Sequence, residues 1–238
     1  MIKIQNVSKT FNTGLGKKIA LENVSFEIPK GSCVIIGGEN GSGKSVLMSI
    51  ISGLDDADCG TVDCHNNRVG LVFQEAETQI LGETPREDVA FGPKNLGIKG
   101  KSLDECVKSA LEKTGLLEKA DFPARFLSGG EKRRLAVACM LAMNNPVIIL
   151  DEPYANLDYS GVRQVNQLVS NLKNEGKTII ILTHEIEKCL GLADIFIVLF
   201  RGKKVFEGTP QMALQQNLEQ WNIRNPVCSY KSLQDFIW

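Results

Sequence analysis

The chain has 238 residues, of which 43% are hydrophobic and 23% are charged, and its formal net charge is −1. This composition is typical of a globular protein with a substantial core, and the near-zero charge argues against nucleic acid as the main partner. No apolar run approaches the roughly 20 residues that a membrane-spanning helix needs, so we expect no direct membrane span. The seven cysteines are scattered and odd in number, which favours a reducing compartment over a disulfide framework.

The first part of the chain is predicted to form strands separated by turns. Apolar residues alternate or run together between Gly, Pro and Asn in KIQNVSKTF, LENVSFEIPKGS and CVIIGG. A glycine-rich loop then precedes an expected helix, KSVLMSIISGL, and two further strands are expected in CGTVDC and VGLVFQ. Residues of about 75–144 are predicted to be mostly helical. Within them Ser102 is the expected N-cap and Gly115 the expected stop of the helix SLDECVKSALEKTGLL.

The last part of the chain alternates strands with a helix. VIIL, TIIILTH and IFIVLF are continuous apolar runs typical of strands buried on both faces, and GVRQVNQLVSNLKNEG is an amphipathic helical pattern. Strands that alternate with helices predict a parallel α/β sheet. The helical segment in the middle is then an inserted subdomain.

The segment GGENGSGKS contains the pattern G-x-x-x-x-G-K-S from Gly38 to Ser45. It lies between a predicted strand and a predicted helix, a context that favours a P-loop over a chance glycine-rich turn. In such a loop backbone N–H groups surround the phosphates of a nucleotide, Lys44 reaches the β- and γ-phosphates, and the Ser45 hydroxyl binds Mg²⁺. The residues predicted to bind the nucleotide here are Gly38, Glu39, Asn40, Gly41, Ser42, Gly43, Lys44, Ser45 and Val46.

The segment VIILDEP carries two adjacent carboxylates at the end of a buried strand. Ligands bind at the carboxyl ends of strands in parallel α/β sheets, so Asp151 is predicted to hold Mg²⁺ and Glu152 to face the γ-phosphate. A carboxylate at that place can orient and deprotonate the attacking water. The alternative is a strand that ends in a solvated acidic turn.

The segment FLSGGEKRRLAVA contains a capping box, in which Ser128 is followed three residues later by Glu131. Gly129 and Gly130 are costly early in a helix. Three cations follow at residues 132–134, where the helix dipole disfavours positive charge. We therefore predict a second anion site at this helix start, against the alternative of a plain capping box.

LSGGEKRRLAVA, followed shortly by VIILDEP, resembles the signature and Walker B motifs of ATP-binding cassette proteins. The resemblance implies an α/β P-loop NTPase fold with an N-terminal antiparallel β part and an inserted α-helical subdomain. It divides a single domain, residues 1–238, into a core of about 1–74 and 145–210, a helical signature subdomain of about 75–144 and a short C-terminal tail, 211–238. In this family two cassettes sandwich two ATP molecules head to tail. The resemblance thus implies that the segment Ser128, Gly129, Gly130 and Glu131 covers the ATP held by the partner's P-loop.

Four further positions match the family. The resemblance implies that Gln74 contacts Mg²⁺ and the attacking water, that His184 contacts the γ-phosphate, and that Asp158 belongs to the D-loop. Phe11 falls where the family stacks an aromatic ring on adenine, with a core residue as the alternative reading. Cys59, Cys64 and His65 lack zinc-site spacing, and no metal is expected there.

The stretch FQEAETQILGETPREDVAFGPKNLG is similar to the corresponding segment of energy-coupling factor transporter ATPases and of cobalt and nickel uptake ATPases. The matching residues are Gln79, Thr84, Asp88, Val89, Ala90, Phe91, Gly92, Pro93, Asn95, Leu96 and Gly97. The resemblance implies a peripheral ATPase on the cytoplasmic face of the membrane that powers uptake of a vitamin or a transition metal ion. Its partners would be a second cassette, identical or paralogous, an integral coupling protein and a small substrate-binding membrane protein. The alternatives are a cassette of another importer and a soluble cassette that does not serve transport.

Overall fold

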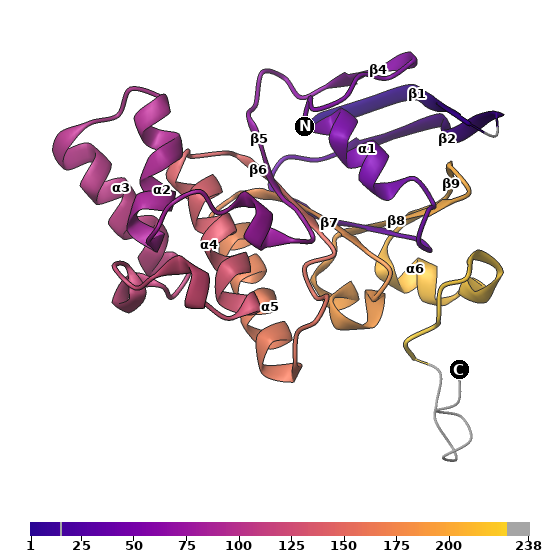
Figure 1. Cartoon of the computed structure of the whole chain (residues 1–238). Helices are drawn as coiled ribbons and strands as arrows, with labels where there is room; N and C mark the ends of the chain where they lie inside the picture. The colour runs from indigo at the N-terminus through magenta and orange to yellow at the C-terminus, as the bar shows by residue number, and fades with distance from the viewer. Residues whose placement is uncertain (15, 228–238) are drawn as a thin grey trace.

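The computed structural model describes residues 1–14 and 16–227 (Figure 1), and the last part of the expected tail, 228–238, lies outside the described residues. The N-terminal part is a three-stranded antiparallel sheet, as expected. Its strand order is β2-β1-β4, with bounds β1 (Ile2–Thr13), β2 (Gly16–Ile28) and β4 (Cys59–Asp63).

The larger sheet has six strands in the order β5-β6-β7-β3-β8-β9. Their bounds are β3 (Cys33–Gly37), β5 (Val69–Val72), β6 (Val147–Asp151), β7 (Thr178–Thr183), β8 (Ile195–Phe200) and β9 (Lys203–Gly208). The first five strands of this order are parallel, which confirms the predicted parallel sheet. The antiparallel edge strand β9 was not predicted. It pairs with β8, with Lys203 opposite Phe200.

The register of the parallel strands brings three segments to one edge of the sheet. Gly37 of β3 pairs with Thr183 of β7, and Asp151 of β6 pairs with Leu182 of β7. The start of the P-loop and the carboxylates after β6 therefore meet at the carboxyl ends of neighbouring strands.

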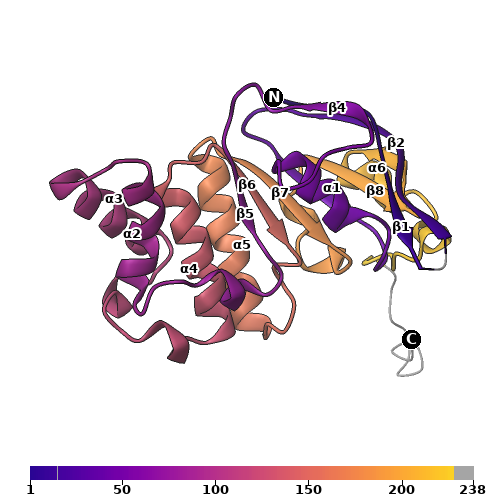
Figure 2. The same cartoon turned by 45° about the horizontal axis from the view of Figure 1, so that its top comes forward.

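Each face of the parallel sheet has its own apolar core, because side chains alternate along a strand. Val34 and Ile36 pack with α1 (Lys44–Ile51) and the small sheet. Cys33 and Ile35 pack on the opposite face with α5 (Tyr159–Asn174). Figure 2 shows α1 between the two sheets. The sheet, covered on both faces, is a rigid support for the loops at its edge.

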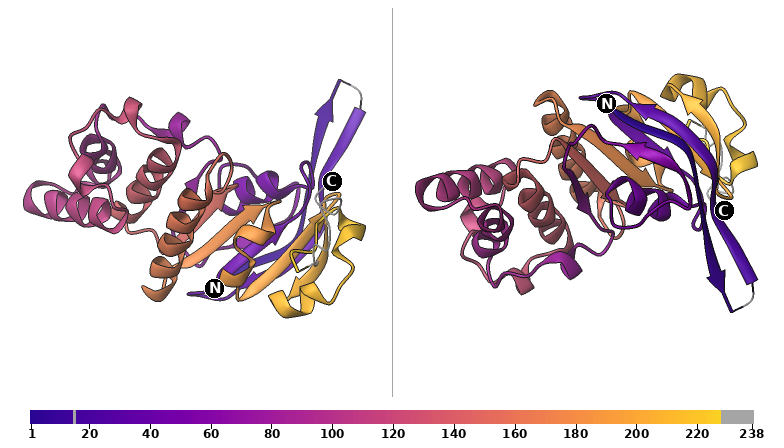
Figure 3. Two further views of the ribbon diagram at one scale, coloured as in Figure 1. Left: turned by 90° about the horizontal axis from the view of Figure 1, so that it is seen from below. Right: turned by 90° about the horizontal axis from the view of Figure 1, so that it is seen from above.

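Three helices stand beside this core and share a separate apolar cluster that includes Val89, Leu111 and Leu135 (Figure 3). They are α2 (Pro85–Asn95), α3 (Gly100–Lys113) and α4 (Gly129–Ala142). The expected N-cap Ser102 is wrong, because α3 begins at Gly100 and its N-cap is Lys99, three residues earlier. Gly115 has a φ of 66° just beyond the end of α3, as expected for its stop.

The remaining helical elements are short. They are η1 (Ala76–Gln79), η2 (Leu117–Lys119), η3 (Ala124–Phe126), η4 (Ile186–Lys188), η5 (Leu190–Leu192), α6 (Pro210–Leu214) and η6 (Leu218–Trp221). Among the helices of the described residues, we find none with the length and apolar character required to cross a bilayer.

Candidate functional site

The predicted P-loop connects β3 to α1, and two of its glycines lie too close to neighbouring backbone for any side chain to fit. Gly38 has a φ of 155°, and a Cβ there would lie 2.3 Å from the carbonyl oxygen of Leu199. Gly43 has a φ of 106°, and a Cβ there would lie 2.6 Å from the carbonyl oxygen of Ala20. Gly43 is also the N-cap of α1, with no side-chain cap and no acidic residue in the first turn. The N–H groups of this helix start are therefore available to an anion.

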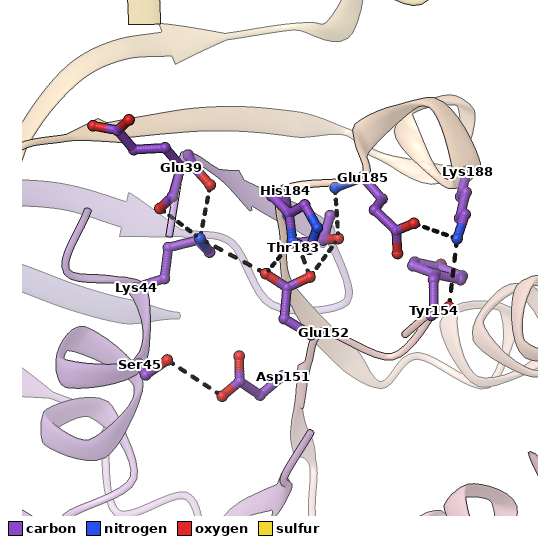
Figure 4. A network of polar contacts seen from close by, with 11 residues as sticks. Glu39, Lys44, Ser45, Asp151, Glu152, Tyr154, Thr183, His184, Glu185 and Lys188 are labelled. Atoms are coloured by element: carbon purple, nitrogen blue, oxygen red, sulfur yellow. Dashed lines mark hydrogen bonds and ion pairs between the residues drawn. The ribbon is translucent and has the colours of Figure 1, made fainter. Parts of the chain in front are cut away.

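Lys44 lies buried at the centre of the site (Figure 4). Its Nζ donates to the carbonyl oxygens of Gly38, at 2.7 Å, and Glu39, at 3.1 Å, and lies 3.7 Å from Glu152 Oε1. Burial lowers the pKa of Lys44, while Glu152 and Asp151 act in the opposite direction. The ammonium is held at the mouth of the P-loop, where it can meet a phosphate.

Asp151 ends β6 and is buried beside the P-loop helix. Its Oδ2 accepts a hydrogen bond from Ser45 Oγ at 3.4 Å, whereas its Oδ1 is buried and has no hydrogen-bond partner among the described residues. Burial, followed by the charge of Glu152, raises the pKa of Asp151. A hydroxyl oxygen beside an unsatisfied carboxylate oxygen suits the hard cation Mg²⁺, so Ser45 and Asp151 fit this metal.

Glu152 is fixed by the end of β7. Its Oε2 accepts hydrogen bonds from Thr183 Oγ1, at 2.9 Å, and from the His184 N–H, at 3.3 Å, while its Oε1 lies 3.0 Å from His184 Nδ1 (Figure 4). The backbone of Glu152 has a φ of 44°, in the left-handed region that non-glycine residues seldom adopt. A residue held in such a conformation, with its carboxylate oriented by three groups, is a candidate catalytic position.

The predicted second anion site begins α4. The capping box is confirmed, because Ser128 Oγ accepts from the Glu131 N–H at 3.3 Å and Glu131 Oε2 accepts from the Ser128 N–H at 2.9 Å. Ser128 and Gly129 are exposed, and Gly130 is half-buried. Among the described residues, no hydrogen bond or ion pair connects this helix start with residues 38–45.

One argument for that anion site is corrected by the structure. The three cations after Glu131 do not require an external anion, because each has a partner within the chain. Lys132 pairs with Glu77, Arg133 donates to backbone carbonyls, and Arg134 donates to Gln164. Only the two glycines, of which Gly129 is exposed and Gly130 half-buried, remain as support for a site at the start of α4.

The other predicted residues lie around this centre. Phe11 is 38% exposed on β1, with Lys9 Nζ 5.5 Å from its ring centroid, so the alternative of a core residue is wrong. Asp158 caps α5 by accepting the Gly161 N–H at 2.7 Å. Gln74 is exposed two residues after β5, and among the described residues its side chain forms no hydrogen bond with Glu152 or Asp151.

The remaining loop residues differ in exposure. Asn40 and Gly41 are exposed, and Ser42 is buried with its hydroxyl unpaired among the described residues. Val46 is half-buried against the core beneath the small sheet. Glu39 accepts a hydrogen bond from Asn222 Nδ2 at 2.7 Å.

Sequence reasoning did not assign a role to Thr183, which holds the Glu152 carboxylate. The only signal was its place at the end of a buried strand. Sequence reasoning counted Arg133 among the cations of an anion site and Gln79 among the residues that match the family. It did not predict that both side chains bind the backbone of the loop that carries Gln74.

Taken together, a P-loop, a pair of carboxylates at the neighbouring strand end and a capped glycine-rich helix define an ATPase of the cassette class. The sequence profile of the family "ABC transporter" matches residues 21–155. The chain therefore belongs to the ABC transporter family and hydrolyses ATP.

Relatives extend the match over almost the whole chain. The energy-coupling factor transporter ATP-binding protein EcfA of Carboxydothermus hydrogenoformans is 37% identical over 99% of this chain and 90% of its own length. The structure of cbiO1 from Clostridium perfringens, described as part of the ABC transporter complex cbiONQ, has a TM-score of 0.82 and 30% identity, covering 94% of this chain and 95% of that one. A dimeric post-hydrolysis structure of an ATP-binding cassette bound to ADP and Pi has a TM-score of 0.78 and 30% identity, covering 88% of this chain and 99% of that one.

Proposed function

We propose that this protein is the ATP-hydrolysing subunit of an energy-coupling factor type importer, peripheral on the cytoplasmic face of the membrane. It would power uptake of a vitamin or a transition metal ion. The likeness to EcfA over 99% of the chain and to cbiO1 supports this proposal. The observation that carries the ATPase part is the Glu152 carboxylate, which is held 3.7 Å from the P-loop ammonium of Lys44.

In the proposed site each residue has a distinct role. The N–H groups of residues 38–46 and the Lys44 ammonium bind the phosphates, and Ser45 and Asp151 hold Mg²⁺. The exposed side chain of Gln74, in the loop after β5, contacts Mg²⁺ and the attacking water. When bound, Mg²⁺ supplies positive charge to the phosphate oxygens. The Glu152 carboxylate accepts the proton of the attacking water, and Thr183 and His184 keep that carboxylate in place.

The signature segment acts in trans in this proposal. Ser128 and Gly129 are exposed at the start of α4, and among the described residues no hydrogen bond or ion pair joins them to the P-loop. A helix start that binds phosphate must therefore meet the ATP of another cassette. Because each chain carries both surfaces, two chains pair head to tail around two ATP molecules. ATP binding closes this dimer, and hydrolysis reopens it.

We propose that the membrane partner binds at a cavity in the helical part. Its volume is about 690 Å³, and residues of η1, of the loop before α2 and of η3 line it. Leu81 and Phe126 stand next to lining residues in the chain and are 69% and 65% exposed. Large exposed apolar side chains are typical of interaction sites. We therefore place the integral coupling protein here.

A tagged pull-down from detergent-solubilised membranes, read by mass spectrometry, tests the transport proposal. Recovery of an integral coupling protein together with a small substrate-binding membrane protein is expected, and Leu81→Asp should lose both. Met212→Asp, which charges another exposed apolar residue, is the matched control and should retain them.

Two other outcomes of the pull-down would contradict the transport proposal. Recovery of a different type of membrane permease would favour the alternative of another ABC importer. Recovery of soluble partners alone would favour a cassette that does not serve transport.

A further inference from the structure

Arg133 is a buried cation of α4 without an acidic partner among the described residues. Its side chain is 7% exposed and forms no ion pair there. Instead its guanidinium donates to three backbone carbonyls. Nη1 donates to Pro153, at 2.8 Å, and to Ala155, at 3.3 Å, and Nη2 donates to Gln74, at 3.0 Å.

These carbonyls belong to the two loops that carry proposed catalytic groups. Pro153 follows Glu152 directly, and Gln74 is itself the proposed contact to Mg²⁺ and the attacking water. A single planar group therefore connects the signature helix α4, the loop after Glu152 and the loop after β5. Burying a cation without a counter-charge is costly, so its retention here calls for a role that an apolar side chain would not fill.

The loop of Gln74 is fixed from its other side by Gln79. The Gln79 Oε1 accepts the Phe73 N–H at 2.9 Å, and its Nε2 donates to the Leu71 carbonyl at 3.0 Å. The amide thus pairs with the end of β5 as another strand would. Gln79 therefore holds the backbone just before Gln74, Arg133 holds the carbonyl of Gln74 itself, and the Gln74 side chain is exposed.

We propose that Arg133 is a positioning residue that sets the place of Gln74 relative to Glu152 and makes α4 and the Gln74 loop move as one unit. This inference rests on the role given to Gln74 in the proposed function. Because Nη1 and Nη2 serve different loops, only the guanidinium fork spans both. A lysine ammonium can hold the carbonyls of Pro153 and Ala155 but not that of Gln74 at the same time.

The test is a double-mutant cycle in the ATPase rate of the purified chain. Arg133→Met should lower kcat by about tenfold to a hundredfold, since small displacements of reacting groups have effects of this size. The KM for ATP should stay nearly constant, because Arg133 does not contact the P-loop. In a Gln74→Ala background the further loss from Arg133→Met should shrink to about twofold or less, since the residue to be positioned is gone.

Two further variants separate positioning from stability. Arg133→Lys should recover much of the melting temperature lost in Arg133→Met but not the kcat. Arg133→Lys can also replace Arg133→Met in the cycle if the methionine variant fails to fold. Cys139→Ala perturbs α4 at a contact with Asp88, away from the Gln74 loop, and its effect on kcat should be small and additive with Gln74→Ala.

Additive losses for Arg133→Met and Gln74→Ala would overturn the positioning role, as would a lysine variant with the wild-type kcat. A Gln74→Ala variant with unchanged kcat would instead remove the role of Gln74 itself. The single variant Gln74→Ala alone shows whether Gln74 has a role. Failure of the Gln74 role can therefore be distinguished from failure of the Arg133 role, which only the double variant shows. The cycle uses only ATP hydrolysis and does not depend on which importer the chain serves.

Discussion

Glu152→Gln should leave ATP binding intact and nearly abolish hydrolysis. In the native protein Thr183 Oγ1 and the His184 nitrogen lie 2.9 Å and 3.3 Å from Glu152 Oε2. A glutamine keeps the size of the side chain, and its amide oxygen can still accept hydrogen bonds from both groups. It loses the negative charge beside Lys44 Nζ and the capacity to accept a proton. The substitution therefore removes the base and preserves the surrounding structure.

The expected loss follows from what a general base contributes. Such a group is worth about 10²–10⁴ in rate, which corresponds to about 3–5 kcal/mol in the activation barrier. Steady-state phosphate release gives kcat, and equilibrium binding of a fluorescent ATP analogue gives the Kd. We expect kcat to fall by at least about a hundredfold while the Kd changes by less than about threefold.

Glu185→Gln is the matched control for this experiment. Glu185 lies one residue after His184, but its carboxylate pairs with Lys188 and not with Lys44. This variant should keep a nearly normal kcat. A Glu152→Gln chain that turns over ATP at close to the wild-type rate would refute the assignment of the base.

Three other substitutions have defined outcomes. Burial raises the pKa of Asp151, so without metal the native state becomes less stable as pH rises through that pKa. Asp151→Asn should therefore raise the melting temperature of the metal-free protein at neutral pH while hydrolysis is lost; an unchanged or lower melting temperature would contradict this. Phe11→Ala should weaken ATP binding by about fivefold, or about 1 kcal/mol, in titration calorimetry if the ring stacks on the base, and an unchanged Kd would exclude stacking. Thr84→Ala removes the cap that accepts the Glu87 N–H and should lower the free energy of unfolding in urea by about 1 kcal/mol, with ATP affinity preserved as the internal control.

The sequence predicted the parts of the fold that follow from long apolar runs and fixed motif spacing. The strands of the parallel sheet and the P-loop were predicted because a strand buried on both faces needs a continuous apolar run. The edge strand β9 was missed because KKVFEG alternates charged and apolar residues only weakly and is half-exposed. The start of α3 was misplaced because serine is a better N-cap residue than lysine, and Ser102 was therefore chosen over Lys99. In the structure Lys99 occupies the N-cap position without a side-chain hydrogen bond to the helix.

Within the site, residues that act by their chemistry were easier to predict than residues that hold others in place. Asp151 and Glu152 carry a charge pattern at the end of a strand, whereas Thr183 and Arg133 act through hydrogen bonds to distant segments. Arg133 was interpreted as one of three cations that attract an anion. Its actual partners, the carbonyls of Gln74, Pro153 and Ala155, lie far away in sequence. Such contacts depend on packing between subdomains, which local patterns do not encode.

The head-to-tail pairing is tested most directly by light scattering of the Glu152→Gln chain with the cassette that co-purifies with it, whether a second copy or a paralogue. On addition of ATP and Mg²⁺, the particle mass should rise from one cassette to two. Adding Ser128→Arg to both chains should prevent this rise, because the arginine fills the exposed start of α4. Ser109→Arg on the exposed side of α3 should not prevent it. An ATP-dependent pair that still forms with Ser128→Arg would contradict a phosphate site shared between two chains.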